Sequence, residues 1–227
     1  TAQIAQGRAW CAAGGRPVVM LASAREGEEA EFLAALKRFM PPAPAVHTQA
    51  APDLVASHAA GPVQWLIVPR HPQRFDEVAA LVQQQGFSVS RRSSWGQGAA
   101  PSVADVWLGD SMGEMALYYG LGHVALLGGS FAPLGGQNLI EAAACGCPIV
   151  TGPSVFNFQE AATLAQQAGA AFPVASMAQG VQLAVDLAQD GARLAQVRAL
   201  AEHFAAAHRG AAGRTAQAVQ ALLSSPR

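Results

Sequence analysis

A glycine-rich loop over residues 128–138 carries the residue types best suited to chemistry in this sequence. Two glycine pairs flank the bend, in the runs Gly128-Gly129-Ser130 and Gly135-Gly136-Gln137-Asn138. Glycine lets backbone N–H groups approach a phosphate closely, and the amino end of a following helix adds a favourable dipole. The loop lacks both the Gly-Lys-Ser/Thr ending of a Walker loop and the G-x-G-x-x-G spacing of a Rossmann motif. It therefore predicts a nucleotide-phosphate site of another kind.

Glu141 falls in the first turn of the helix expected after this loop. A carboxylate is electrostatically favourable there, and its oxygens can accept hydrogen bonds from both hydroxyls of a ribose. Asn138, three residues earlier, lies on the same side and adds a second polar group. The simpler alternative is a helix-start charge with no ligand.

Arg70 and His71 directly follow the apolar run 65–68. If that run is a buried strand, the Arg70 guanidinium emerges at its end, where it can neutralise a phosphate or a carboxylate. An ordinary surface arginine is the alternative. We interpret His71, which stands before Pro72, as a residue that shapes the turn and not as a catalytic base.

Three further strand-to-helix loops hold unusual polar residues, namely 22–28, 109–114 and 152–160. In the first two, the Gly-Glu and Ser-x-x-Glu patterns fit a plain helix start equally well. In the third, Asn157 either closes over one end of a bound ligand or caps the next helix.

These loops need a scaffold that holds them together. Short apolar runs lie at residues 17–23, 65–68, 87–90, 106–108, 124–127, 148–150 and 170–174. They alternate with segments of helical spacing, which predicts an α/β fold with a doubly wound, Rossmann-like parallel sheet. Ligands of such sheets lie outside the carboxyl ends of the strands, where the strand order reverses. We therefore expect all of these loops at one edge.

The composition fits one compact domain, since 51% of the residues are hydrophobic and 13% are charged. A net charge of −1 gives no electrostatic support for a nucleic-acid partner. No apolar stretch is long enough to span a membrane, and the opening lacks the order of a signal peptide, so we expect the chain as given to be soluble. Cys11, Cys145 and Cys147 form no C-x-x-C cluster, which favours packing roles in a reducing cytoplasm over disulfides or zinc.

The chain opens without an initiator Met, which suggests a segment of a longer polypeptide. We interpret residues 1–16 as a linker from a missing N-terminal domain and residues 17–208 as the nucleotide-binding domain. Residues 209–227 are expected to form a helix that packs towards the missing domain.

The loops together closely resemble the C-terminal half of the Kdo transferases, which transfer 3-deoxy-D-manno-octulosonic acid (Kdo) from CMP-Kdo to lipid A precursors. The similarity covers roughly residues 15–190. Its motifs are Ala22-Ser23 with Gly27-Glu28-Glu29, Val68-Pro69-Arg70-His71-Pro72, Gly109-Asp110-Ser111-Met112-Gly113-Glu114, the glycine-rich loop with Glu141, and Gly152-Pro153 with Asn157-Phe158. Five motifs in this order are a specific signal.

The resemblance implies the donor-binding half of a GT-B glycosyltransferase, whose two Rossmann-like domains face a cleft. It implies inverting transfer from CMP-Kdo with no metal and no cofactor. The missing N-terminal half would supply the general base, the site for the lipid A precursor and the contact with the membrane surface. The full-length enzyme is expected at the cytoplasmic face of the bacterial inner membrane, and this fragment alone is expected to be inactive.

The same resemblance implies which residues bind the donor, namely Ser23, Arg25, Arg70, His71, Met112, Gly113, Glu114, Gly129, Ser130, Gly136, Gln137, Asn138, Glu141 and Asn157. Arg70 and the backbone of residues 129–130 and 136–138 are assigned to the phosphate. Glu141 is assigned to the ribose, and residues 112–114 are assigned to the cytosine.

Three positions depart from the family pattern, which usually has His at Arg25 and Gln137 and Pro at Ala142. Gln137 can still donate a hydrogen bond, and Arg25 adds positive charge that could help to hold the Kdo carboxylate. Two alternatives stay open: another GT-B-type enzyme, such as a UDP-sugar transferase or epimerase, and a non-catalytic nucleotide-binding domain.

Overall fold

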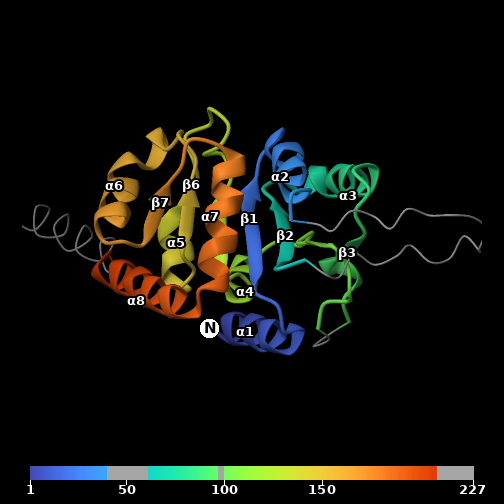
Figure 1. Cartoon of the computed structure of the whole chain (residues 1–227), viewed down its shortest axis with the longest axis horizontal. Helices are drawn as coiled ribbons and strands as arrows, with labels where there is room; N and C mark the ends of the chain where they lie inside the picture. The colour runs from blue at the N-terminus through green and yellow to red at the C-terminus, as the bar shows by residue number, and fades with distance from the viewer. Residues whose placement is uncertain (40–60, 97–99, 209–227) are drawn as a thin grey trace, which may run out of the picture.

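The computed structural model describes residues 1–39, 61–96 and 100–208 (Figure 1). Its elements in chain order are α1 (Ala2–Gly14), β1 (Val18–Ala24), α2 (Glu28–Leu36), β2 (Gln64–Pro69), η1 (Pro72–Arg74), α3 (Phe75–Gln84), β3 (Val89–Arg91), η2 (Arg92–Ser94), β4 (Val106–Leu108), α4 (Met115–Leu121), β5 (Val124–Leu127), α5 (Leu139–Ala144), β6 (Ile149–Thr151), η3 (Phe156–Phe158), α6 (Gln159–Gln167), β7 (Ala171–Pro173), α7 (Met177–Gln189) and α8 (Gly191–His208). The helix expected over residues 209–227 lies outside the described residues.

The strands pair in parallel as one 7-stranded sheet, in the order β3-β4-β2-β1-β5-β6-β7. From β1 the chain moves outwards to β2 and then to β3 at the edge of the sheet, β4 pairs between β3 and β2, and the chain then crosses to the other side of β1 with β5. The crevice beyond the carboxyl ends of β1 and β5 is therefore the point where the strand order reverses. The predicted doubly wound parallel sheet is confirmed.

Strand β1 is buried on both faces because its apolar residues alternate between two cores. Val18 and Met20 pack in the core that includes α1, α4 and α5, whereas Val19 and Leu21 pack in the core that includes α2, α3 and α7. Figure 1 shows α7 on the near side of the sheet and α4 and α5 behind it. A strand covered on both sides is an uninterrupted apolar run, which is why the sequence alone indicated it.

Residues 1–16, expected as a linker, contain a helix that the sequence did not indicate. Helix α1 packs against α4, and neither Gly7 nor Gly120 leaves room for a Cβ at the crossing. The ring of Trp10 is buried 5.8 Å from that of Trp95. Because α1 is rich in alanine and has no clear apolar stripe, periodicity could not indicate it. In this structure the segment is part of the folded domain.

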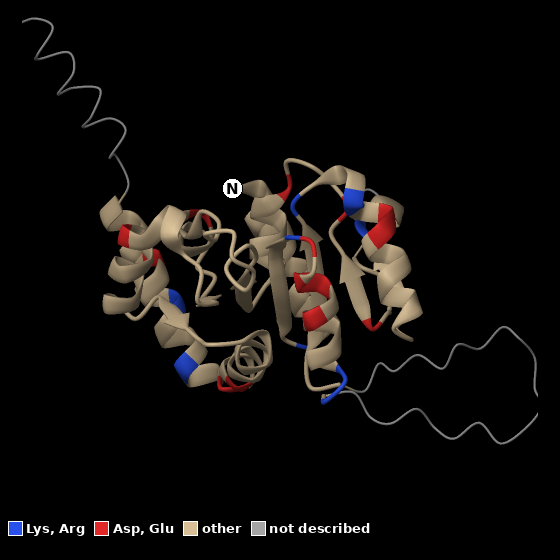
Figure 2. Cartoon of the chain, turned by 90° about the horizontal axis from the view of Figure 1, so that it is seen from above, with Lys and Arg blue, Asp and Glu red and all other residues tan. Residues whose placement is uncertain are grey.

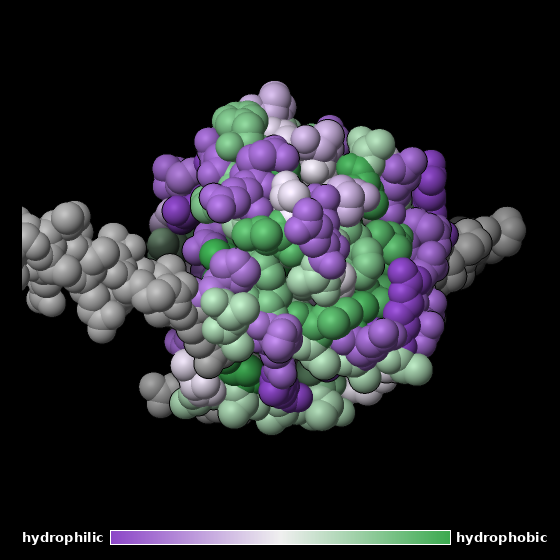
Figure 3. Space-filling view, turned by 90° about the vertical axis from the view of Figure 1, so that its left-hand side faces the viewer, coloured by the Kyte–Doolittle hydropathy of each residue, from purple (hydrophilic) through white to green (hydrophobic). Residues whose placement is uncertain are grey.

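The remaining boundaries agree with the sequence to within a few residues. Strand β3 begins at Val89, two residues later than expected, because the Asp105 carboxylate accepts hydrogen bonds from the N–H (2.8 Å) and hydroxyl (2.6 Å) of Ser88. A break at Asp190 separates α7 from α8. On the side of the molecule that carries α6 and α8, small apolar side chains are interspersed with polar ones (Figure 3).

Candidate nucleotide-binding site

Five strand-to-helix loops meet at the carboxyl edge of the sheet, because parallel strands all end there. Along this edge they follow β4, β2, β1, β5 and β6. In the same order, the residues at or shortly after these strand ends include Glu114, Arg70, Ser23, Gly129 and Asn157. The fold thus brings together residues that are far apart in the sequence.

The glycine-rich loop folds back on itself, and two of its backbone N–H groups already have hydrogen-bond partners within the protein. Gly129 and Gly136 have φ angles of 72° and 75°, and the Gly136 N–H donates to the Gly129 carbonyl (2.9 Å). The Gly129 N–H donates to the carboxylate of Glu28 (2.8 Å). These two N–H groups are therefore already bonded, which corrects the expectation that they are open to a phosphate.

Ser130 requires a second correction, because it is fully buried. Its hydroxyl donates to the Leu127 carbonyl (2.5 Å) and accepts from the Gly152 N–H (2.8 Å). These bonds tie the loop after β5 to the loop after β6. Ser130 consequently supports the site and does not reach a ligand.

The start of α5 presents three polar side chains. Asn138 caps the helix, since its Oδ1 accepts from the Ile140 N–H (3.0 Å). Glu141 is exposed one turn further on, and Gln137 is half-buried with its amide above Gly129. Gln137, Asn138 and Glu141 therefore remain accessible to a ligand.

Arg70 is exposed immediately after β2, as expected. Within residues 1–39, 61–96 and 100–208, no hydrogen bond or ion pair engages its guanidinium. His71 is half-buried in extended backbone at the start of the short η1 turn, where its carbonyl accepts from the Arg74 N–H (3.1 Å) and its side chain makes no capping hydrogen bond. Arg25 is half-buried, and its backbone N–H donates to Glu28 (2.9 Å). The structure thus provides two arginines at neighbouring strand ends.

Ser23 has strained backbone at the centre of the edge. Among the described residues it is the one non-glycine residue with a positive φ, at 55°. The β1–β2 register shifts at the same point, between Ala22 and Ala24. This conformation brings the Ser23 carbonyl so close to Gly128 that a Cβ there would overlap it. Such strain costs about 1–3 kcal/mol and is concentrated at functional sites.

The loop after β4 combines exposed residues with a fixed carboxylate. Met112 is 60% exposed and Gly113 is also exposed. Glu114 forms an ion pair with Arg92 (2.8 Å) and accepts a hydrogen bond from the Ser111 hydroxyl. Glu114 is therefore held in place beside residues 112–113, where a ligand has access.

Asp110, at the start of the same loop, fixes it to the end of β3 and the segment that follows β3. Its buried carboxylate accepts from Arg91 Nε (2.6 Å) and from the N–H (2.7 Å) and hydroxyl (2.6 Å) of Ser93. Burial by itself would raise the pKa of Asp110, but the hydrogen bonds from Ser93 and Arg91 outweigh it and lower the pKa. The ionised carboxylate thus fixes the end of β4.

Asn157 clamps the glycine-rich loop from the β6 side. Its side-chain amide donates to the Leu134 carbonyl (3.0 Å), and its backbone N–H donates to the Gly135 carbonyl (3.2 Å). The Gly135 N–H in turn donates to the Ser154 hydroxyl (2.9 Å). Helix α6 begins at Gln159, so the helix-cap alternative for Asn157 is wrong.

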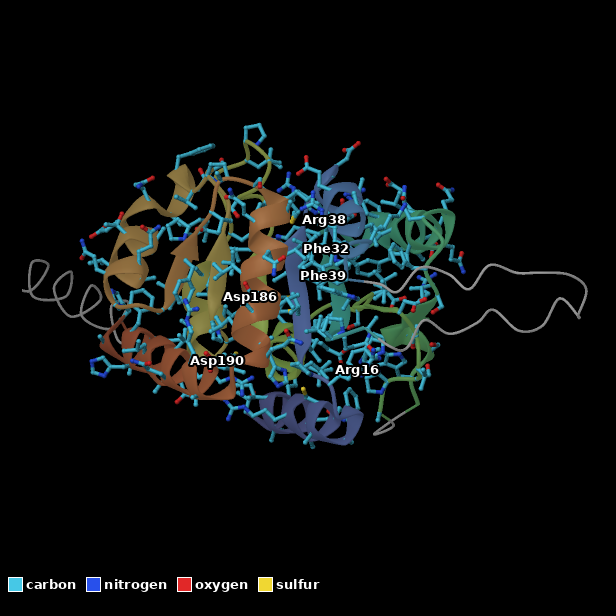
Figure 4. The ribbon with its side chains drawn as sticks, in the orientation of Figure 1. Arg16, Phe32, Arg38, Phe39, Asp186 and Asp190 are labelled. Carbon is cyan, nitrogen blue, oxygen red and sulfur yellow. The ribbon has the colours of Figure 1, made fainter. Side chains whose placement is uncertain are left out.

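Two cavities lie at opposite edges of the sheet. One of about 430 Å³ lies at the carboxyl edge between the glycine-rich loop and the loop after β6, with Phe131 and Phe156 in its walls. One of about 750 Å³ lies at the amino edge, lined in part by Arg8, Arg16 and His123. Figure 4 shows Arg16 at that end, below β1. The larger cavity is therefore remote from the predicted site.

Several further features of the described residues bear on function. In the part of the chain that the structure describes, no group of three or more His, Cys, Asp or Glu side chains is arranged to hold a metal ion. No helix in the described ranges is long and apolar enough to cross a membrane. In the ribbon view of Figure 2, positions of Lys and Arg and of Asp and Glu are spread over several elements of the described residues. The three cysteines are buried, and burial raises the pKa of Cys147 to about 12, so these thiols pack and stay protonated.

The fold is that of a Rossmann-like α/β domain of the GT-B type. The structure of HepE from Anabaena in complex with UDP-glucose shares the fold, with a TM-score of 0.62 and 14% identity, over 99% of this chain and 53% of that one. The C-terminal CMP-Kdo binding domain of WaaA from Acinetobacter baumannii has a TM-score of 0.72 and 31% identity, over 89% of this chain and 97% of that one.

The similar proteins found by sequence are enzymes of the same kind as the second of these structures. The 3-deoxy-D-manno-octulosonic acid transferase of Bordetella pertussis is 44% identical over 96% of this chain and 48% of its own length. That of Haemophilus influenzae is 39% identical over 53% of this chain and 28% of its own length. The chain belongs to the 3-deoxy-D-manno-octulosonic acid transferase family, and it spans about half the length of the Bordetella relative. No family model matches the chain.

Three supporting residues were missed by sequence reasoning. Glu28 binds the glycine-rich loop, Ser154 holds Gly135, and Arg92 holds Glu114. Glu28 stood inside a recognised motif, but its partner segment could not be known before β1 was seen to pair with β5. Nothing local in the sequence marks the other two.

Proposed function

We propose that this chain binds CMP-Kdo as the donor-binding half of a glycosyltransferase that transfers Kdo to a lipid A precursor in lipopolysaccharide biosynthesis. The observation that carries the proposal is its 31% identity, with a TM-score of 0.72, to a CMP-Kdo binding domain of which it covers 97%. The row of polar loops at the carboxyl edge supports it, because nucleotides bind at this edge of doubly wound sheets.

The donor's phosphate is assigned to side chains and no longer to the Gly129 and Gly136 N–H groups, which are already bonded. Arg70 offers an accessible guanidinium, the strongest type of phosphate partner. Arg25 adds a second positive charge for the Kdo carboxylate, and Gln137 and Asn138 add neutral amide donors.

The ribose and the base of the nucleotide are assigned to residues at the same edge. Glu141 accepts the ribose hydroxyls, and the cytosine lies against residues 112–114, where Glu114 is already oriented by Arg92. Ser23, His71 and Asn157 shape the walls of this site. Their roles stay predictions, since each has a structural explanation as well.

The reaction proposed for the whole enzyme is an inverting displacement at the anomeric carbon of Kdo. A hydroxyl of the acceptor attacks while CMP departs, and the arginines stabilise the charge that develops on the departing phosphate. We propose that no metal is required. The general base, the acceptor site and contact with the cytoplasmic face of the inner membrane belong to a half of the enzyme beyond this chain.

Isothermal titration calorimetry of this chain with CMP, CTP and UDP tests the proposal. We expect CMP to bind more tightly than UDP, and we expect Arg70→Ala and Glu141→Ala each to weaken CMP binding about tenfold, in line with the loss of one charge-assisted contact. Arg8→Ala, at the amino edge, is the matched control. Tighter binding of UDP would indicate a different sugar-nucleotide enzyme, and unchanged affinity in both edge variants would exclude this site.

A further inference from the structure

The carboxylate of Glu28 occupies the crevice between the carboxyl ends of β1 and β5. The residue is 1% exposed, although it carries a charge at the start of α2. One oxygen accepts from the N–H groups of Arg25 (2.9 Å) and Gly129 (2.8 Å). The other accepts from those of Phe131 (3.0 Å) and Ala132 (3.1 Å).

Three of these four donors belong to the glycine-rich loop, 101 to 104 residues further along the chain. Neighbouring backbone N–H groups that converge on one point form a concave anion site of the kind that holds phosphates in other loops. Here the anion is part of the protein. Glu28 therefore takes the place that a glycine-rich loop commonly reserves for a phosphate, and it satisfies donors that would otherwise be buried without partners.

The constraint continues from Gly129 to the residues that face the ligand. The Gly129 carbonyl accepts from the Gly136 N–H (2.9 Å), and Gly136 directly precedes Gln137 and Asn138. Glu28 is thus linked by two consecutive hydrogen bonds to the start of α5. A loop with several glycines has many backbone conformations available, so an internal anion that selects one of them preorganises the site.

We infer that Glu28 is a positioning residue for the donor nucleotide: its carboxylate holds the glycine-rich loop in the conformation that presents Gln137 and Asn138, without itself contacting the ligand. This inference rests on the proposed function for the identity of the nucleotide. The fixing of the loop itself is independent of that identity.

Glu29 provides a matched control. It is the next residue of α2, it is also fully buried, and its carboxylate pairs with Arg74 (2.7 Å) and not with the glycine-rich loop. Replacing either glutamate with glutamine removes a buried charge of the same kind from the same helical turn. Only one of the two replacements alters the acceptors of the loop.

The experiment compares Glu28→Gln with Glu29→Gln in this chain. CMP affinity is measured by calorimetry at a temperature where circular dichroism shows each variant folded, and amide hydrogen exchange is followed at residues 129–132. Both variants are expected to unfold at lower temperatures than the parent. Glu28→Gln should weaken CMP binding at least tenfold and speed exchange at Gly129, whereas Glu29→Gln should change affinity less than twofold and leave that exchange unchanged.

Glu28→Ala gives a second measurement that does not depend on the glutamine variant folding. The truncated side chain leaves room for a small carboxylate, so added acetate should restore CMP affinity in Glu28→Ala and have no such effect on the parent. Equal CMP affinity in Glu28→Gln and the parent, or an equal loss in Glu29→Gln, overturns the inference. If the parent itself does not bind CMP, the proposed function fails, and the exchange rates at residues 129–132 alone decide whether Glu28 fixes the loop.

Discussion

Both edges of the sheet carry arginine side chains, but those edges differ in whether the polar groups already have partners within the protein. At the amino edge the larger cavity is bordered by groups that have protein partners: Arg8 pairs with Glu202 (3.4 Å), and His123 Nδ1 accepts from the Val18 N–H (3.0 Å). At the carboxyl edge the space is smaller, yet Arg70 is unpaired within the described residues and Ser23 is strained. Cavity size alone would select the amino edge and not the carboxyl edge that we propose as the nucleotide site.

The direction of the chain explains the difference. Each helix that follows a strand begins at the carboxyl edge, as α2, α3, α4 and α5 do. Their positive amino ends and unpaired N–H groups therefore gather on that side and favour anions. The amino edge receives the helix ends of opposite polarity. An anionic nucleotide is consequently favoured at one edge before any individual side chain is considered.

The largest effect that separates the edges is expected for Gly128→Ala. A Cβ at this position would overlap the backbone carbonyl of Ser23, and neither backbone can move without disturbing β1 or β5. We expect a loss of about 3 kcal/mol in the free energy of unfolding, measured by urea denaturation. Weakened CMP binding should accompany it.

Gly191→Ala at the amino edge is the control for that substitution. Nothing lies within 4 Å of a Cβ at Gly191, which begins α8. Because alanine is the better helix former, this variant should be neutral or more stable by up to about 1 kcal/mol. Comparable destabilisation by both substitutions would show that close packing is not special to the carboxyl edge.

A smaller effect is expected at the amino edge on acidification. Burial, and secondarily the charge of Arg198, lowers the pKa of His123 from 6.5 to about 4. Between these values the unfolded chain binds a proton that the folded chain does not, so stability falls as the pH falls through this window. His123 is half-buried, so solvent screens part of the effect, and we expect a loss of about 1–2 kcal/mol.

His123→Asn isolates that contribution, because asparagine can still accept from the Val18 N–H but does not titrate. Denaturant unfolding at intervals between pH 6.5 and 4 should give a shallower loss of stability for this variant. Parallel curves for the parent and the variant would contradict the assignment to His123.

The smallest effect is expected for Arg8→Ala. The Arg8–Glu202 pair is exposed, with side chains 55% and 56% accessible, so solvent screens it. The free energy of unfolding should change by less than about 0.5 kcal/mol, as measured by thermal unfolding. CMP affinity should stay within experimental error, and a clear loss would mean that the amino edge influences the nucleotide site.

Much of the scaffold could be predicted from the sequence because its signals are local. The apolar runs at β1, β2 and β5, the helix start at Asn138 and the glycine pairs each depend on residues close together in the chain. Helix α1 could not be predicted, since its packing depends on Gly7 meeting Gly120 and leaves no apolar stripe to recognise. The burial of Ser130 also depends on contacts between segments distant in the chain. The sequence therefore assigned Ser130 to the ligand, although the fold buries it.

The sequence by itself determined the doubly wound sheet, the family and the set of loops that carry polar residues. Only the tertiary structure decided what each of those residues does. Once β5 pairs with β1, the Glu28 carboxylate meets the glycine-rich loop and takes the Gly129 N–H, which the sequence had assigned to a phosphate, together with the N–H groups of Phe131 and Ala132. Hydrogen-bond partners that lie a hundred residues apart are set by strand order, and strand order is a property of the packed molecule that no local pattern records.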